Sequence, residues 1–179
     1  MKGSTGILLA ALVLAGFFIG RYLYKQPRFV NGDSGPNFAA TLADGRDFEL
    51  KDLRDRYVLV DFWGSWCAPC LQAVPELKNL YQEYKDVPFE DATGFEIISV
   101  GVEEKEENWR RALTRLQLPW SYQILDLTTS LRFFDAPLAE QYGIKELPTT
   151  YLLDPDGQII GVNLTGMEIR KLLDRRIKK

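Results

Sequence analysis

The chain has 179 residues, of which 46% are hydrophobic and 26% charged, as in an ordinary globular protein. It contains two cysteines and no histidine, which excludes a Ser-His-Asp triad, a Cys-His pair and any His-ligated metal site. Two cysteines also make a poor zinc site, because closed structural sites usually need four N or S ligands. The formal net charge of −3 gives no argument for a nucleic-acid partner.

The first 25 residues are expected to form a separate N-terminal segment. The run from Gly6 to Gly20 has no charged or strongly polar residue, and with its flanks it reaches the length that a bilayer core of about 30 Å requires. Arg21 and the tyrosines beside it suit a membrane interface. A cleaved signal peptide is the alternative, but no small-x-small cleavage site before a polar start is evident. We therefore expect residues 1–25 to be an uncleaved signal anchor with one transmembrane helix.

The rest of the chain is expected to be a linker, 26–36, followed by one domain, 37–179. A hairpin is predicted between Phe38 and Leu50, with Asp44-Gly45 as its turn. Continuous apolar runs predict buried strands, and apolar residues three or four positions apart predict helices. The expected strands are 57–63, 95–102, 149–153 and 158–162. The expected helices are one after Cys67, with apolar residues at helical spacing from Leu71 to Tyr84, and those at 106–118, 138–142 and 167–177. This order predicts an α/β fold with a mixed central sheet and helices on both faces.

The sequence Trp63-Gly-Ser-Trp66-Cys67-Ala-Pro-Cys70 lies where a predicted strand ends and a helix begins. A thiol at a helix N-terminus meets unpaired N–H groups and the positive end of the helix dipole, which should lower the pKa of Cys67 from about 8.5 toward roughly 7. Cys70 follows one turn later, where it can attack a mixed disulfide formed by Cys67. Pro69 costs no helical hydrogen bond in the first turn. A static disulfide is the alternative, but the strand, helix and tryptophan together favour a redox pair.

Four features resemble a known family. The run Val60-Asp-Phe-Trp-x-x-Trp-Cys-x-Pro-Cys70 is similar to the active-site strand and loop of thioredoxin, and Pro75 to the proline that kinks its active-site helix. Leu147-Pro148-Thr149 resembles the cis-proline loop that faces the disulfide. The N-terminal hairpin and an insertion before the last hairpin are similar to the TlpA/ResA-type branch, the membrane-anchored thiol–disulfide oxidoreductases of bacterial envelopes. The resemblance covers about residues 34–177 and implies a thioredoxin-like fold.

The resemblance implies roles for residues around the cysteines. Pro148 should be cis and present the backbone of Leu147 to an extended substrate peptide, unless it is an ordinary loop proline. Trp66 should shield the sulfurs and offer an apolar docking face, unless it is simple packing. Asp61 matches the buried acid that helps deprotonate the second thiol, its pKa raised by desolvation. The alternative for Asp61 is a strand-end carboxylate that reaches solvent.

The chain departs from the family at Ala73, where many TlpA/ResA-type proteins carry a glutamate. If an acid tunes Cys70, it must then be Asp61, which weakens the implied specialisation for apocytochrome c. The Ala-Pro dipeptide lacks the histidine of strongly oxidising envelope enzymes, so a reductant or general exchanger is favoured over a disulfide donor. The acidic stretch 103–107 is interpreted as solvated carboxylates at a helix start rather than as a metal or partner patch.

Together these features predict a thiol–disulfide oxidoreductase of the bacterial inner membrane, single-pass, with its domain in the periplasm or outside the cell. Positive-charge counting favours the opposite orientation, but a tether would add little to a cytosolic domain. We expect protein clients, an upstream membrane thiol donor, no metal and no cofactor beyond the Cys67–Cys70 disulfide. The alternatives are a peroxiredoxin-like thiol peroxidase, whose Pro-x-x-x-Thr-x-x-Cys site is absent, and a module that binds clients without turnover.

Overall fold

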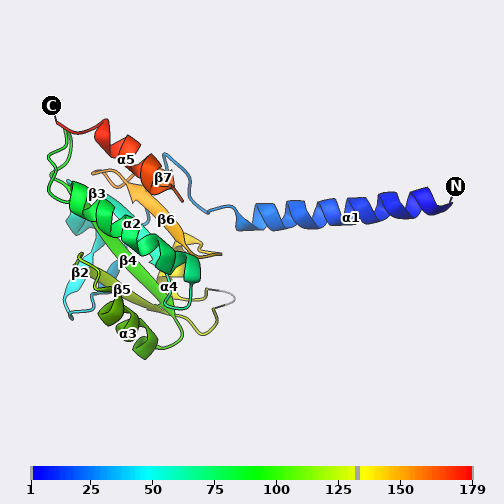
Figure 1. The fold of residues 1–179 in the computed structure, drawn as a ribbon, viewed down its shortest axis with the longest axis horizontal. Helices are drawn as coiled ribbons and strands as arrows, with labels where there is room; N and C mark the ends of the chain where they lie inside the picture. The colour runs from blue at the N-terminus through cyan, green and yellow to red at the C-terminus, as the bar shows by residue number, and fades with distance from the viewer. Residues whose placement is uncertain (1, 132–133, 179) are drawn as a thin grey trace.

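The computed structural model describes residues 2–131 and 134–178, and consists of an N-terminal helix and an α/β body (Figure 1). The body is built on a five-stranded sheet with the strand order β5-β4-β3-β6-β7. Three strands are mutually parallel, and the last two pair antiparallel. The strands are β3 (Tyr57–Trp63), β4 (Phe95–Glu103), β5 (Tyr122–Leu127), β6 (Thr149–Leu153) and β7 (Ile159–Val162). The predicted mixed sheet is therefore confirmed.

The central strands are formed by the runs that the sequence singled out as continuously apolar. Every residue of β3 and β4 is buried, as expected for strands with packed layers on both faces. Apolar side chains of α2 (Ala68–Tyr84) and α5 (Gly166–Asp174) cover one face. On the same face, α3 (Glu106–Leu116) packs Trp109 against Gly101 of β4. The other face is covered by α4 (Pro137–Tyr142) and the N-terminal hairpin, so the helices lie on both faces as predicted.

The predicted hairpin is present and packs beside α4. Its strands are β1 (Ala39–Thr41) and β2 (Asp47–Glu49), which pair antiparallel, and a 3-10 helix, η1 (Leu50–Leu53), follows. Gly45 adopts a φ of 86° in the turn, a conformation that glycine reaches without steric cost. Phe38 and Phe48 contact each other edge to face and enter the core. A bridge between Leu42 and Ile124 attaches the hairpin to β5.

The structure contains a strand, β5, that the sequence analysis did not predict. Its sequence, YQILDL, is interrupted by Gln123 and Asp126 and so lacks the continuous apolar run of a central strand. The strand forms because β4 pairs with it in parallel, and because the buried carboxylate of Asp126 is satisfied. The Asp126 carboxylate accepts hydrogen bonds from the N–H groups of Leu138 and Ala139 at 3.1 and 2.8 Å. These bonds also satisfy the start of α4.

Two helices end earlier than predicted. Helix α3 ends at Leu116, where Gln117 adopts a left-handed φ of 47° and its N–H bonds to Leu113. Helix α5 ends at Asp174 rather than at residue 177. Ile177 instead forms a bridge with Phe89 in the connection between α2 and β4. The last residues therefore pair with a distant segment of the same chain, and helical periodicity in the sequence does not reveal such pairing.

The N-terminal segment forms helix α1 (Lys2–Lys25), which projects away from the body (Figure 1). Across the described residues, no helix is both long enough and apolar enough to cross a membrane. The expected transmembrane span is therefore not confirmed. The segment 26–36 that follows lies partly against the sheet edge, because Gly32 and Asp33 exchange backbone hydrogen bonds with Ile159 at 2.8 Å.

Candidate active site

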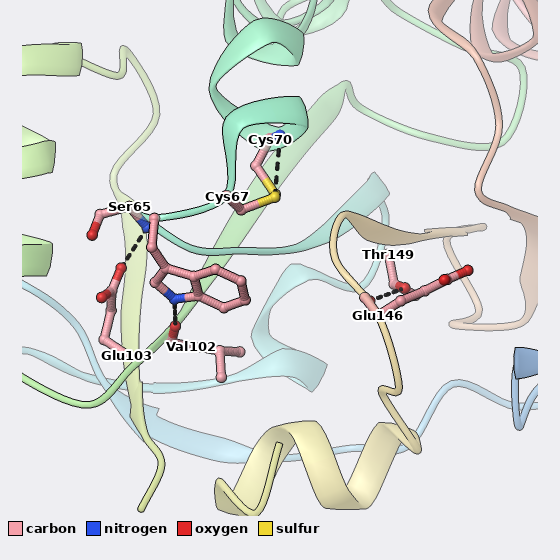
Figure 2. Close-up of a disulfide and its surroundings, with 8 residues drawn as sticks. Ser65, Cys67, Cys70, Val102, Glu103, Glu146 and Thr149 are labelled. Carbon is pink, nitrogen blue, oxygen red and sulfur yellow. Dashed lines mark hydrogen bonds between the residues drawn. A yellow bond between two sulfur atoms is a disulfide. The ribbon is translucent and has the colours of Figure 1, made fainter. Parts of the chain in front are cut away.

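The cysteine motif lies between the end of β3 and the start of α2, as the sequence predicted. Cys67 is the N-cap of α2, and Cys70 lies in its first turn. The backbone N–H of Cys70 points at Cys67 Sγ, with a distance of 3.3 Å (Figure 2). The two cysteines form a disulfide, with their Cα atoms 5.3 Å apart. In the reduced protein this N–H would favour a thiolate on Cys67, because hydrogen bonds to a charged form stabilise it.

The loop before Cys67 is fastened to the end of β4. Strands β3 and β4 run parallel, with Trp63 opposite Gly101, so the residues after Gly101 reach the loop that follows β3. The indole Nε1 of Trp66 donates to the carbonyl of Val102 at 3.0 Å, and the N–H of Ser65 donates to Glu103 Oε1 at 2.5 Å (Figure 2). Two hydrogen bonds, each between a side chain and the backbone, thus hold the loop at the same strand end.

Glu103 corrects the expectation that the whole acidic stretch 103–107 is solvated. It is the last residue of β4 and only 1% exposed. A buried carboxylate needs hydrogen-bond donors, and the loop N–H of Ser65 supplies one. The following residues do begin a helix, since Glu106 and Glu107 occupy the first turn of α3.

Trp66 is exposed, and both cysteines are covered. The Trp66 side chain is 44% exposed, whereas Cys67 and Cys70 are 5% and 4% exposed. Its ring stacks on Phe134 with centroids 6.3 Å apart. Gly64 makes room for this arrangement, because a Cβ there would lie 2.6 Å from the Trp66 indole nitrogen. An aromatic surface therefore lies beside a disulfide of low exposure, which suits the predicted docking face.

The Leu147-Pro148 peptide bond is cis, which confirms that prediction. Leu147 packs against the cluster of buried side chains that contains Cys67 and Cys70. Pro148 lines a pocket of about 210 Å³ together with Cys70 and Asp61. The chain thus brings the proline loop, the second cysteine and the buried acid to one place, although they are far apart in sequence. Pro69 lies in the exposed first turn of α2.

Asp61 is buried, as the resemblance to thioredoxin implied. It lies in the middle of β3 with 6% exposure. Burial raises its pKa to about 7, and a hydrogen bond from Ser99 opposes part of that rise. A carboxyl with this pKa can both accept and release a proton near neutral pH. Asp61 lines the same pocket as Cys70.

Ala73 and Glu76 line the same pocket on the α2 side. Glu76 pairs with Arg170 of α5, which also binds Glu83 at 2.9 Å. Sequence reasoning missed Glu76, although it follows Ala73 at the i+3 spacing that places both on one helix face. Sequence reasoning also missed Ser99 and Glu103, whose positions depend on strand register, and Trp120, which lies in the loop before β5. Within residues 2–131 and 134–178, no group of three or more Cys, Asp or Glu is arranged to hold a metal ion.

Comparison with known proteins agrees with this geometry. A family model described as thioredoxin-like matches residues 55–159. The thiol-disulfide oxidoreductase ResA of Halalkalibacterium halodurans is 33% identical over 161 residues, which cover 90% of this chain and 81% of that protein. ResA of Bacillus thuringiensis subsp. konkukian is 29% identical over 97% of this chain and 92% of its own length. The thioredoxin domain of a Bacteroides vulgatus thiol-disulfide oxidoreductase superposes with a TM-score of 0.70 at 28% identity, covering 84% and 99% of the two chains.

The fold and the cysteine pair define a thioredoxin-like protein. Within that class, the chain belongs to the TlpA/ResA-type family of thiol–disulfide oxidoreductases. It is an enzyme of thiol–disulfide exchange, like the homologues named thiol-disulfide oxidoreductases. The predicted family and enzyme class are confirmed.

Proposed function

We propose that this protein is a membrane-tethered reductant of protein disulfides in the bacterial envelope, acting through Cys67 and Cys70. The observation that carries the proposal is the pairing of a helix-capping cysteine with a second cysteine that shares a pocket with buried Asp61. The first arrangement favours a nucleophilic thiolate, and the second supplies a proton acceptor for the resolving thiol.

The reaction begins with the reduced pair. The Cys67 thiolate attacks one sulfur of a client disulfide, the client S–S bond breaks, and the departing client sulfur leaves with its electron pair and takes a proton. Asp61 accepts the proton of Cys70, whose thiolate attacks Cys67 Sγ and releases the second client thiol. The client disulfide gains two electrons, and the enzyme ends with the Cys67–Cys70 disulfide that the structure contains. An upstream membrane thiol donor must then reduce that disulfide, and no further cofactor is required.

Client docking is assigned to the surface around the disulfide. Trp66 offers an exposed aromatic face, and the cis-Pro148 loop places Leu147 against the cysteine cluster. An extended peptide can add to such a backbone edge by strand-like hydrogen bonds. Among possible clients, apocytochrome c is the one that the resemblance to the TlpA/ResA-type branch implies, and the departure at Ala73 weakens that assignment.

The apolar surface of α1 is the basis for the proposed membrane tether. Large apolar side chains such as Leu12, Phe17 and Phe18 are 60–70% exposed on this projecting helix. Contiguous apolar surface of this kind is costly in water and marks contact with lipid or another protein. The tether predicts that the full chain sediments with bacterial membranes, whereas a chain without residues 1–25 stays in the soluble fraction. A C-terminal reporter that is active only outside the cytoplasm should be active, and a silent reporter would reverse the proposed orientation.

The exchange activity is tested by trapping. The variant Cys70→Ser should accumulate mixed disulfides between Cys67 and client proteins, identified by non-reducing gels and mass spectrometry. The matched double variant Cys67→Ser with Cys70→Ser should accumulate none. A client-binding module without turnover would give the same co-purifying proteins in both variants with no covalent adduct, and that result would overturn the proposal. A peroxidase would instead consume peroxide faster than simple thiols do.

A further inference from the structure

A buried polar pair lies beside Asp61, outside the cysteine motif. Asp61 of β3 and Ser99 of β4 are direct partners in the parallel ladder, so their side chains lie on the same face of the sheet. Ser99 is 1% exposed, and its hydroxyl lowers the pKa of Asp61 against the rise that burial causes. Behind it, the indole Nε1 of Trp120 donates to Ser99 Oγ at 3.0 Å. All three residues line one small cavity together with Cys70.

The chemistry of the three groups fixes the direction of these hydrogen bonds. An indole N–H can only donate, and a serine hydroxyl has one proton and two lone pairs. Because Ser99 Oγ accepts from Trp120, its own proton remains available to Asp61. The ionised carboxylate only accepts, so the order is indole to hydroxyl to carboxylate. A chain of this direction favours the ionised form of Asp61 and occupies one side of its carboxylate.

We propose that Ser99 and Trp120 are positioning residues that orient the Asp61 carboxylate to take the proton of Cys70. This inference rests on the proposed function, in which Asp61 is the base of the resolving step. With one side of the carboxylate held by Ser99, the rest of its acceptor capacity is left for the Cys70 thiol. The proton moves from Cys70 Sγ to Asp61, and the electron pair left on sulfur forms the new bond to Cys67 Sγ. The bond between Cys67 Sγ and the client sulfur breaks in the same step, and the client leaves as a thiolate with that electron pair.

Few charged groups compete with this arrangement. Among the residues that line the two pockets beside Asp61, Glu76 of α2 is the other charged residue, and Cys70 is the remaining titratable group. Glu76 is paired with Arg170 of α5. The neighbouring strands present the uncharged residues Ser99 and Thr150. After burial itself, the neutral pair is therefore the main local influence on the Asp61 carboxylate.

The test measures the titration of Asp61 directly, in the oxidised full-length protein in detergent, by carboxyl 13C NMR. In this state the two cysteines do not titrate, because both are in the disulfide. Ser99→Ala removes a hydrogen-bond donor to the ionised Asp61 carboxylate, so it should raise the titration midpoint of Asp61 by about one pH unit. Trp120→Phe keeps an aromatic ring and removes only the indole donor, so it should raise the midpoint by less. Ser99→Thr keeps the hydroxyl, so its Asp61 midpoint should be close to that of the wild type.

The control is Trp109→Phe. Trp109 is as buried as Trp120, at 2% exposure, and its Nε1 has no hydrogen-bond partner among the described residues. It should leave the Asp61 midpoint unchanged. An unchanged midpoint in both Ser99→Ala and Trp120→Phe would overturn the proposal, as would equal shifts in Trp120→Phe and Trp109→Phe. Because Trp120→Phe retains a ring, it keeps the test available if Ser99→Ala lowers stability.

A second readout connects the titration to the reaction. The rate of client release from a Cys67 mixed disulfide should rise with pH as Asp61 ionises, and the midpoint of that rise should move upward with the NMR midpoint. A merely structural role would lower the rate at every pH without moving the midpoint. The NMR titration needs no client, so a failure to trap clients would count against the proposed function while leaving this measurement decisive for Ser99 and Trp120.

Discussion

The two cysteines are almost equally buried, at 5% and 4% exposure, yet their surroundings differ in kind. Both belong to one buried cluster, but Cys67 has a hydrogen-bond donor at its sulfur and follows an exposed residue in the chain. The N–H of Cys70 points at its sulfur, and the loop before it carries exposed Trp66. Around Cys70 the neighbouring groups belong to the interior, with Asp61 and the Ser99–Trp120 pair behind it.

The comparison shows that exposure alone does not assign roles to the cysteines. A donor near a sulfur stabilises the thiolate, whereas a buried carboxylate near a thiol offers a place for its proton. The Cys67 side is therefore suited to attack and the Cys70 side to resolution. Each of the following changes removes one feature from one side, so the two sides can be tested separately.

The largest expected effect belongs to the Cys70 side, through Asp61→Asn. The pKa of Asp61 is raised from 3.8 to about 7 in the folded protein, so between those values the folded state holds a proton that the unfolded state has lost. The free energy of unfolding should therefore fall as pH rises from about 4 to about 7 and then level off. Asn carries no charge to bury, so at pH 8 the variant should be the more stable protein by up to ~4 kcal/mol.

Urea unfolding at pH 4 and pH 8 measures this difference, which should nearly vanish at pH 4. Asp156→Asn in the exposed turn before β7 is the matched control and should keep the wild-type fall in stability with pH, because Asp61 is unchanged. A wild-type stability that is flat between pH 4 and pH 7 would contradict the burial of a carboxylate at this position.

An intermediate effect is expected on the Cys67 side, through Glu103. Glu103→Ala leaves the Ser65 N–H without the acceptor it has at 2.5 Å, and the loss of such a bond to a charged group costs about 1.5–3 kcal/mol. Glu103→Gln keeps a side-chain oxygen that can accept, so it should lose less than half as much. Chemical denaturation of both variants at pH 7 gives the comparison. Equal losses in the two variants would show that the charge, and not the acceptor, holds the loop.

A thiol–disulfide exchange assay tests whether Glu103 also affects the reaction at Cys67. If Glu103 holds the loop that leads to Cys67, Glu103→Ala should slow the first attack on a client disulfide while leaving the resolving step near its wild-type rate. Stopped-flow measurement of the two steps separates them. A loss confined to the resolving step would place Glu103 on the Cys70 side instead.

The parts of the site that could be predicted from the sequence are those encoded locally. The position of Cys67 at the start of α2 follows from an apolar strand, a short loop and a helical pattern within 28 residues. The buried position of Asp61 and the cis bond before Pro148 followed from motif resemblance. In each case the neighbouring residues alone carry the signal.

The missed parts depend on which residues pair across the sheet. Strand β5 has a broken apolar pattern and forms through its pairing with β4 and through the burial of Asp126 against α4. Ser99 and Glu103 are placed by the register of β4 against β3, and a one-residue slip would turn both away. A single sequence does not state that register, so their contacts with Asp61 and Ser65 could not be predicted.

The smallest expected effect belongs to Trp66, at the surface of the Cys67 side. Trp66→Phe loses the indole bond to the Val102 carbonyl at 3.0 Å but keeps an aromatic ring beside Phe134. Because the residue is 44% exposed, water can replace part of that bond, and the free energy of unfolding should fall by less than ~1 kcal/mol. Trp66→Ala also removes the aromatic face, so it should raise KM for a disulfide peptide more than Trp66→Phe does. If both variants raise KM equally, the indole N–H holds the loop and the ring is not the docking face; if neither does, clients dock elsewhere around the disulfide.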